Sequence, residues 1–369
     1  VNHLAKIPLA RPVVDEEMLE AVNIALRNER LVLGESVFKF EEAFARYSGT
    51  KHAVSVSSGT DALQLVFIAL NLKGKSVVTS PLSFVATSNA VIQAEGRPYF
   101  ADASEADYNL DPAATRAGWR EGTGAILPVH LFGQPAPMDE LMELAEEKGA
   151  VVVEDACQAH GAIYRGSRAG SIGKAGCFSF YPTKNMTVGG DGGMITTDDE
   201  KLAKLLAKLR DCGRVSRYVH DVVGYTSRLN TANAAFGLVQ LKKLDSWDER
   251  RRVIAARYAR KLSSAGVGLP PMPGSDILPV FHLFVIRTDK RDKLADHLAS
   301  KGIETGVHYP VPIHLQPIYQ QLYGFRGGEY PVSEALSTSL LSLPIFPSMT
   351  DEQVDMVCEE IVSYLKGVQ

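Results

Sequence analysis

The length and charge of the chain limit the kinds of protein it can be. Its 369 residues, 45% of them hydrophobic, exceed the roughly 250 to 300 residues at which a single hydrophobic core stops growing, so two unequal domains are expected. The formal net charge is only -4. Because the charges form no long run of one sign, a nucleic-acid or membrane surface is not favoured, and a small-molecule partner is the better interpretation.

The cysteines and the N-terminal residues indicate the compartment. The four cysteines are scattered without a CxxC pair, which favours neither a disulfide framework nor a zinc site. They are Cys157, Cys177, Cys212 and Cys358. The first residues, VNHLAKIPLARPVVDEE, lack the apolar core of a signal peptide, and no stretch approaches the roughly 18 apolar residues of a membrane span. We therefore expect a cytoplasmic protein with reduced cysteines.

Between residues 53 and 197, short β-rich runs alternate with longer helical patterns. The runs are AVSV, SVVT, PYFAD, AILPVH, AVVVED, CFSF and MITT. This alternation predicts an α/β fold with a mainly parallel sheet and helices on both faces. AVVVED is apolar without alternation, as in a strand buried on both faces. Its end should therefore emerge at the carboxyl edge of the sheet, where such folds bind ligands.

A long helical pattern over residues 231–263 follows the predicted sheet. Beyond it, FHLFVIR and IETGVHY predict strands, and RDKLADHLASKG and DEQVDMVCEEIVSYL predict helices. We therefore expect a large domain over residues 1–250, N-terminal segment included, and a smaller C-terminal α/β domain over residues 251–369.

Lys184 lies in FSFYPTKNMTVGGDGG, after a short apolar strand and before a glycine-rich bend. Its neighbours are apolar or small, and partial desolvation there would lower the pKa of the amine and make it a better nucleophile and Schiff-base former. Taken alone, the residue is better interpreted as an ordinary lysine in a loop. Its partners in the fold decide between these interpretations.

Asp155 ends the run AVVVED and precedes the lysine by 184 − 155 = 29 residues. A carboxylate there could pair with the pyridinium nitrogen of pyridoxal phosphate and keep the ring protonated, so that the ring accepts electrons from a substrate carbanion. The alternative is a helix N-cap, because Asp is favoured at strand-to-helix turns.

The string SSGTDALQL, residues 57–65, joins a predicted strand to a predicted helix. The backbone N–H groups and the positive end of the helix dipole there would bind a phosphate, and Gly59 would permit its close approach. A plain N-cap explains the same string. Ser179 could add a hydroxyl to that phosphate, and Phe84 could stack on the pyridine ring. The glycines at 189–193 are interpreted as the turn that leaves the lysine loop.

The loop GVHYPVPIHLQP gathers two histidines and a tyrosine between prolines that restrict its backbone. His308, Tyr309 and His314 are candidates for substrate contacts, and structural histidines are the alternative. Metal ligation is not favoured, since no second ligand cluster accompanies them.

Taken in order, SSGTDAL, EDACQAHGA, FSFYPTKN, GDGG, GYTSRL and GVHYPVPIHLQP resemble the DegT/DnrJ/EryC1/StrS family of sugar aminotransferases. The resemblance extends from IPLARP at residue 7 to LSLPIFPSMTDEQ near residue 353. It implies a fold-type I pyridoxal-phosphate enzyme with a large cofactor-binding domain, a smaller C-terminal domain, and a homodimer whose active sites are shared between subunits.

The resemblance also assigns roles to residues. Lys184 matches the Schiff-base lysine, Asp155 the pyridinium partner and Gln158 the side chain near the ring hydroxyl. The phosphate contacts match Gly59, Thr60 and Ser179, and the stacking aromatic matches Phe84. His308, Tyr309 and His314 fall on the substrate loop.

The chain departs from the family pattern at GYTSRL. Thr226 stands where an asparagine is expected to reach the neighbouring subunit's cofactor phosphate, and a threonine hydroxyl has a shorter reach. Asn230 and Asn233 also replace more usual residues.

The activity implied by the resemblance is transfer of an amino group from an amino acid, glutamate, to a nucleotide-linked keto-sugar, with a lean toward a 3-keto substrate. A sugar dehydratase with the same cofactor is an alternative, but such relatives carry histidine at the position of Lys184. A non-catalytic cofactor-binding regulator is the other alternative, and the sequence contains neither a helix-turn-helix module nor a basic patch in its support.

Overall fold

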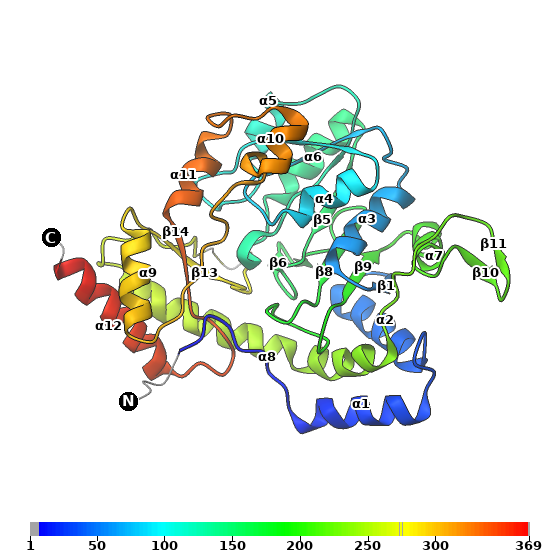
Figure 1. The fold of residues 1–369 in the computed structure, drawn as a ribbon, viewed down its shortest axis with the longest axis horizontal. Helices are drawn as coiled ribbons and strands as arrows, with labels where there is room; N and C mark the ends of the chain where they lie inside the picture. The colour runs from blue at the N-terminus through cyan, green and yellow to red at the C-terminus, as the bar shows by residue number, and fades with distance from the viewer. Residues whose placement is uncertain (1–6, 273, 275, 368–369) are drawn as a thin grey trace.

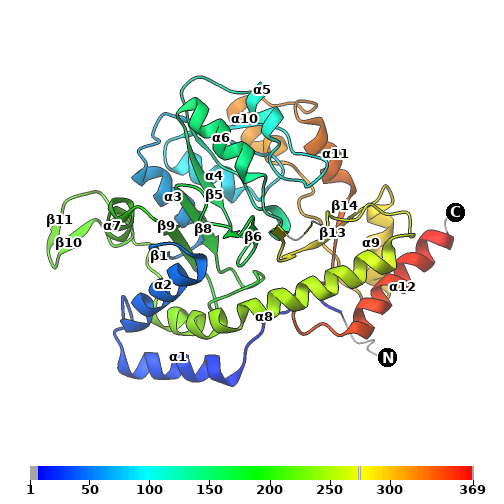
Figure 2. The ribbon, with the colours of Figure 1, turned by 180° about the vertical axis from the view of Figure 1, so that it is seen from behind.

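The structure, a computed structural model, describes residues 7–272, 274 and 276–367 (Figures 1 and 2). The helices are α1 Glu16–Asn28, α2 Glu35–Ser48, α3 Gly59–Ala69, α4 Ala86–Gln93, α5 Pro112–Ala117, α6 Met138–Lys148, α7 Glu200–Leu209, α8 Thr231–Leu262, α9 Arg291–Ser300, α10 Pro317–Tyr323, α11 Pro331–Ser339 and α12 Asp351–Gly367. The strands are β1 His52–Val56, β2 Ser76–Thr79, β3 Arg97–Phe100, β4 Thr123–Ile126, β5 Val151–Asp155, β6 Ile163–Tyr164, β7 Ser167–Arg168, β8 Ala175–Ser179, β9 Gly193–Thr197, β10 Arg214–Ser216, β11 Val219–His220, β12 Ile277–Leu278, β13 Phe284–Arg287 and β14 Leu340–Leu343.

A seven-stranded sheet forms the centre of the fold, in the order β1-β9-β8-β5-β4-β2-β3. The neighbours from β8 through β5, β4 and β2 to β3 are parallel. Strand β9 runs antiparallel to both of its neighbours, β8 and β1. The prediction of an α/β fold with a mainly parallel sheet is therefore confirmed.

Helices cover both faces of this sheet. Successive residues of a strand point to opposite faces, so apolar residues on both faces need a layer of helices to bury them. On one face, α3, α4 and α7 pack against residues such as Val153 and Ile195. On the other, α2 and α6 pack against residues such as Met194 and Val152. The run AVVVED forms β5, whose residues after Val151 are all buried, as its continuous apolar pattern predicted.

A second core lies at the C-terminal end of the chain. The antiparallel pair β13–β14, the helices α9 and α12, and the C-terminal half of α8 bury their apolar side chains together. Ile7 packs into this core and bridges to Ile303, so the N-terminal segment meets the C-terminal elements there. Helix α8 runs unbroken across residue 250, and the predicted domain division at that position stays a prediction.

One predicted strand is wrong. IETGVHY forms isolated bridges instead of a strand. Ile303 pairs with Ile7 and Gly306 pairs with Ser342, so no single neighbour pairs with the segment along its length. The four cysteines are free. Within the described ranges, no helix has the length and apolar character needed to cross a membrane.

Candidate active site

A cavity of about 420 Å³ lies where β5 and β8 end and α3 begins. The residues at its wall include every cofactor contact predicted from the sequence except Thr226. Those residues are Gly59, Thr60, Phe84, Asp155, Gln158, Ser179 and Lys184. His308 and Tyr309 also line it. The parallel sheet explains this convergence, since the carboxyl ends of its strands meet at one edge.

Asp155 is a buried carboxylate at the end of β5, only 4% exposed. Its Oδ2 accepts a hydrogen bond from Thr87 Oγ1 at 2.8 Å, and its Oδ1 accepts one from Cys157 N at 3.2 Å. No helix follows it, since residues 156–162 form turns, so the helix N-cap interpretation is wrong. The two donors hold the carboxylate against the cavity.

Lys184 lies in a turn after β8, where its N–H donates to Tyr181 O at 2.8 Å. Burial lowers the pKa of the Lys184 amine, and the nearby thiol of Cys157 and carboxylate of Asp155 oppose this shift. A lower pKa increases the uncharged, nucleophilic fraction of the amine. The arrangement suits attack on a carbonyl carbon.

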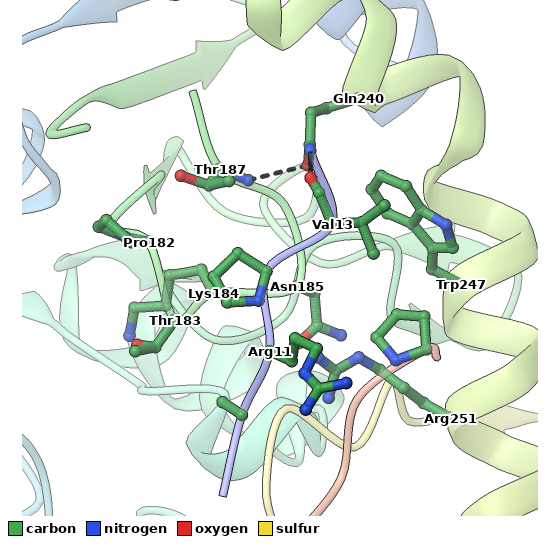
Figure 3. Close-up of a pocket in the computed structure, with 13 residues that line it drawn as sticks. Arg11, Val13, Pro182, Thr183, Lys184, Asn185, Thr187, Gln240, Trp247 and Arg251 are labelled. Carbon is green, nitrogen blue, oxygen red and sulfur yellow. Dashed lines mark hydrogen bonds between the residues drawn. The ribbon is translucent and has the colours of Figure 1, made fainter. Parts of the chain in front are cut away.

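Helix α8 anchors the loop that carries Lys184 (Figure 3). Thr187 N donates to Gln240 Oε1 at 3.3 Å. Asn185 Nδ2 donates to Asp248 Oδ1 at 2.9 Å, and both Gln240 and Asp248 belong to α8. The loop that carries the lysine is thus fastened to a long helix by its next residues.

The N-terminus of α3 lies at the cavity wall, at the turn predicted to bind a phosphate. Ser58 is the N-cap and accepts a hydrogen bond from Asp61 N at 3.0 Å. The N-cap interpretation is therefore confirmed, and the phosphate contact stays a prediction. The N–H groups of Gly59 and Thr60 belong to the first turn, where the helix itself offers no acceptor. A Cβ at Gly59 would lie 2.7 Å from Ser179 Cβ and 2.8 Å from Cys157 Sγ. Only glycine fits there.

Gln158, just after β5, and Tyr309, in the C-terminal part of the chain, are joined across the cavity. Gln158 Nε2 donates to Tyr309 OH at 3.1 Å, and its Oε1 accepts from Phe132 N at 2.7 Å. The ring of Tyr309 lies 5.8 Å from that of Phe84, which is 54% exposed at the cavity rim. Two aromatic rings therefore flank the entrance.

His308 is held by β14, where its Nδ1 lies 2.8 Å from Ser342 Oγ. Burial, and then the charge of Lys184, lower the pKa of His308 to about 4. The ring is therefore uncharged at neutral pH and can exchange hydrogen bonds with a ligand without adding charge.

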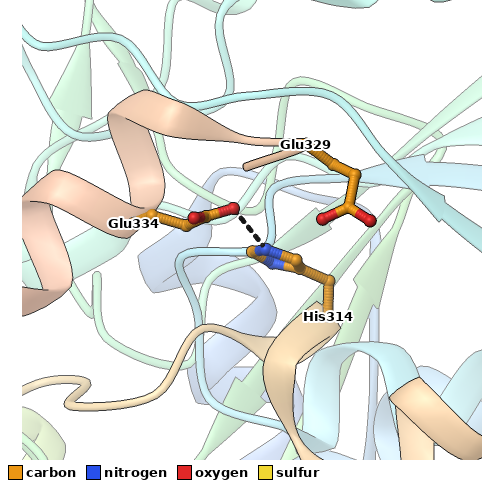
Figure 4. A group of neighbouring side chains, drawn as sticks. All are labelled: His314, Glu329 and Glu334. Atoms are coloured by element: carbon orange, nitrogen blue, oxygen red, sulfur yellow. Dashed lines mark hydrogen bonds and ion pairs between the residues drawn. The ribbon is translucent and has the colours of Figure 1, made fainter. Parts of the chain in front are cut away.

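Two predicted site residues lie elsewhere. His314 is fully buried, and its Nε2 lies 2.9 Å from Glu334 Oε1 (Figure 4). The ligand atoms of His314, Glu329 and Glu334 lie within 4.8 Å of one another, but both carboxylates also accept backbone N–H groups of the 326–330 loop. The trio thus closes that loop, as the structural interpretation of His314 allowed.

Thr226 also lies outside the cavity of its own subunit. It is exposed, bridges to Asp211 and has its Oγ1 3.4 Å from Cys212 Sγ. The two unusual asparagines nearby have structural partners: Asn230 caps α8 by accepting from Asn233 N at 2.9 Å.

Sequence reasoning missed several residues of the cavity, among them Thr87, Cys157 and His282. Thr87 lies in PLSFVATSNA, three positions after Phe84, and Cys157 lies in the EDACQAHGA motif. His282 interrupts the apolar run before β13, and a polar residue in such a run was the available signal. The bend at 189–193 has the predicted turn, with Gly189 at φ 78°, but Asp191 and Gly192 reach the cavity too.

Comparison with known proteins identifies the family. The DegT/DnrJ/EryC1/StrS aminotransferase family matches residues 12–362. The chain belongs to this family. It is 41% identical to the dTDP-3-amino-3,4,6-trideoxy-alpha-D-glucose transaminase of Streptomyces venezuelae, over 94% of this chain and 92% of that protein. It is also 40% identical to the "Pleiotropic regulatory protein" of Geobacillus stearothermophilus, over 95% of each.

Solved structures of family members share the fold. S. venezuelae DesV in complex with a ketimine intermediate aligns with a TM-score of 0.92 at 40% identity, covering 95% of this chain and 94% of that chain. The PLP form of the putative sugar aminotransferase Spr1654 from Streptococcus pneumoniae aligns with a TM-score of 0.94 at 26% identity, covering 99% and 100%. The fold-type I architecture implied by the sequence motifs is thereby confirmed.

Proposed function

We propose that this protein is a pyridoxal-phosphate-dependent aminotransferase that moves an amino group from an amino acid, glutamate, to a nucleotide-linked keto-sugar for deoxyamino-sugar biosynthesis. The observation that carries the proposal is the convergence of Lys184, Asp155 and the α3 N-terminus on one cavity. The transaminase activity and 3-amino product in the name of the Streptomyces relative support it, and favour amination at C3.

The residues of the cavity fit the cofactor group by group. The carboxylate of Asp155 would face the pyridine nitrogen, and the cradle of Gly59, Thr60 and Ser179 would take the phosphate. Gln158 would lie near the ring hydroxyl, and Phe84 would stack on the ring. When bound, pyridoxal phosphate supplies an electron sink for a carbanion.

The protein's own groups handle binding and protons. In the amino-acid half of the exchange, the Lys184 amine would take the proton from the α-carbon of the amino acid. In the sugar half it would deliver a proton to the sugar carbon that receives the amino group. The donors Thr87 and Cys157 N keep Asp155 oriented. The substrate side of the cavity is formed by His308 and Tyr309, which enter from the C-terminal part of the chain.

Two alternative functions are a sugar dehydratase, which Lys184 argues against, and a regulator, which the name of one relative suggests. A sugar dehydratase of this family would carry histidine at that position, so Lys184 favours transamination. The name of the Geobacillus relative keeps a regulatory role as a second candidate. Formation of an amino-sugar from a keto-sugar and glutamate supports the aminotransferase, while DNA retardation without any amino transfer would support the regulator.

We also propose a homodimer with shared active sites. Helix α1 and the following residues expose several large apolar side chains: Leu19, Ile24, Leu26, Leu31 and Val32. The hairpin β10–β11 projects away from the rest of the chain in Figures 1 and 2, with Tyr218 81% exposed and Val223, just after it, 89% exposed. Apolar surface of this extent is typical of a subunit interface, and a second copy is the occupant that the family suggests.

Lys184→Ala tests the central proposal. The variant should lose turnover and the absorbance near roughly 410 to 430 nm that a lysine-bound cofactor gives, because no other amine replaces Lys184 Nζ at the cavity wall. Lys204→Ala, on the exposed side of α7, is the matched control and should retain both. Retained turnover in Lys184→Ala would refute the assignment.

A further inference from the structure

His282 is a polar side chain of the cavity whose role none of the sequence motifs suggested. It lies just before β13, is 8% exposed, and shares the cavity wall with Lys184 and His308. Its Nδ1 lies 3.3 Å from Asn185 Oδ1. Asn185 directly follows Lys184 (Figure 3), so the same loop supplies the lysine and the partner of His282.

The orientation of the Asn185 amide is determined by its other contacts. Its Nδ2 lies 3.0 Å from the carbonyl oxygen of Val280 and 2.9 Å from Asp248 Oδ1. A carbonyl oxygen can only accept, so the group facing Val280 must be the NH₂ group. Its two hydrogens go to Val280 and Asp248, and the remaining Oδ1 faces His282.

The amide in turn fixes the tautomer of His282. Because Asn185 Oδ1 can only accept, His282 Nδ1 must carry the hydrogen. Burial, and then the charge of Lys184, lower the pKa of His282 well below its usual value, so the ring is neutral and Nε2 carries none. Among the described residues, none forms a hydrogen bond with that nitrogen.

We propose that Asn185 is a positioning residue that holds His282 as the Nδ1–H tautomer, so that His282 Nε2 accepts a hydrogen bond from a hydroxyl group of the bound sugar. The choice of ligand group follows from chemistry. An uncharged nitrogen with a lone pair binds O–H donors, whereas a carboxylate or phosphate offers only acceptors and is disfavoured there. His282 therefore serves the sugar and not the amino-acid carboxylate. This inference rests on the proposed function.

Nitrogen-15 NMR of the histidine-labelled holoenzyme tests the tautomer directly. We expect His282 to show a protonated Nδ1 and an unprotonated Nε2, with the signal assigned by its loss in His282→Asn. A protonated Nε2 would overturn the proposal. The measurement requires no turnover, so its result is independent of whether the protein transfers amino groups.

The His282→Asn variant also separates the two halves of the reaction. Its amide nitrogen can replace Nδ1 as the donor to Asn185, but no acceptor remains in place of Nε2. We expect kcat/KM for the sugar half-reaction to fall on the order of 10- to 100-fold, because a ligand hydroxyl loses its partner, while the amino-acid half-reaction changes less than about threefold. His52→Asn, outside the cavity at the start of β1, is the matched control.

Equal loss in both halves would assign His282 a purely structural role and overturn the proposal, and unchanged kinetics would do the same. If the unmodified protein transfers no amino group at all, the proposed function fails, and the NMR result alone decides whether Asn185 sets the tautomer.

Discussion

The histidines near Lys184 have lowered pKa values and stay uncharged at neutral pH. His160 is fully buried. It packs against Phe178 and Phe180, with ring centroids 5.3 Å and 5.7 Å away. Burial, and then the charge of Lys184, lower the pKa of His160 to about 3. A protonated ring there would lie beside the lysine without compensation.

These histidines predict a loss of stability in acid. The folded-state pKa values of His160 and His308, about 3 and about 4, lie below the ordinary value of 6.5. Their contribution to the free energy of unfolding is therefore complete above pH 6.5 and is lost as the pH falls toward those folded values. In this pH range, each of the two histidines should take up about one proton when the protein unfolds.

Urea unfolding between pH 8 and pH 4 at constant ionic strength measures the effect, with roughly unit pH steps. His160→Phe should make the stability less dependent on pH, because an uncharged ring of similar shape replaces the titrating one. His220→Gln, in the exposed hairpin, is the control and should leave the slope unchanged. An unaltered slope in His160→Phe would show that His160 does not titrate as expected.

Among the elements, α3 begins at the turn that is proposed to bind the cofactor phosphate. Its N-cap Ser58 and its first residue Gly59 follow directly from the end of β1. The close approach of Ser179 and Cys157 to Gly59 leaves no room for a side chain. Strand ends and a helix start thereby meet at a single point, which is where a phosphate would bind.

Gly59→Ala should disturb this meeting point. The added Cβ would lie under 3 Å from both neighbours, so β8 or the start of α3 must shift, and we expect cofactor affinity to fall by at least about tenfold. Spectroscopic titration of the cofactor-free protein with pyridoxal phosphate measures the affinity. Gly118→Ala, at the end of α5 and outside the cavity, should bind the cofactor normally. Unchanged affinity in Gly59→Ala would argue against a phosphate at this turn.

The molecule as a whole combines buried cores with apolar side chains that stay exposed on α1 and beside the β10–β11 hairpin. Two cores, one around the large sheet and one around β13–β14, are linked by α8. The projecting hairpin and α1 expose apolar side chains that neither core covers. Thr226 follows the hairpin, outside its own cavity, so the predicted contact with a neighbouring subunit's cofactor needs a dimer.

A hairpin variant tests the assembly. Tyr218→Ser combined with Val223→Asp should shift the protein from dimer to monomer, because a charge would replace one of the most exposed apolar side chains. Light scattering after size exclusion measures the mass, and activity should fall with dissociation if the sites are shared. A control pair of Lys204→Ala and Lys301→Ala, both exposed, should stay dimeric. A fully active monomer would contradict the shared site.

The sequence by itself determined the fold class and grouped many of the residues that line one cavity. Continuous apolar runs such as AVVVED favour strands buried on both faces, and parallel strands bring their carboxyl ends to one edge. This is why Asp155, Ser179, Gly59 and Lys184, far apart in the chain, could be grouped before any coordinates. The motifs also indicated the family, because their order and spacing along the chain are specific to it.

Only the tertiary structure decided the contacts made by side chains without a periodic pattern. Thr87 and His282 reach the cavity because the start of α4 and the segment before β13 both border it, and no local pattern encodes that packing. His314 shared a loop with His308 and Tyr309, but the loop turns it toward Glu334. Hydrogen bonds between distant segments depend on how the elements pack, and so could not be predicted from spacing alone.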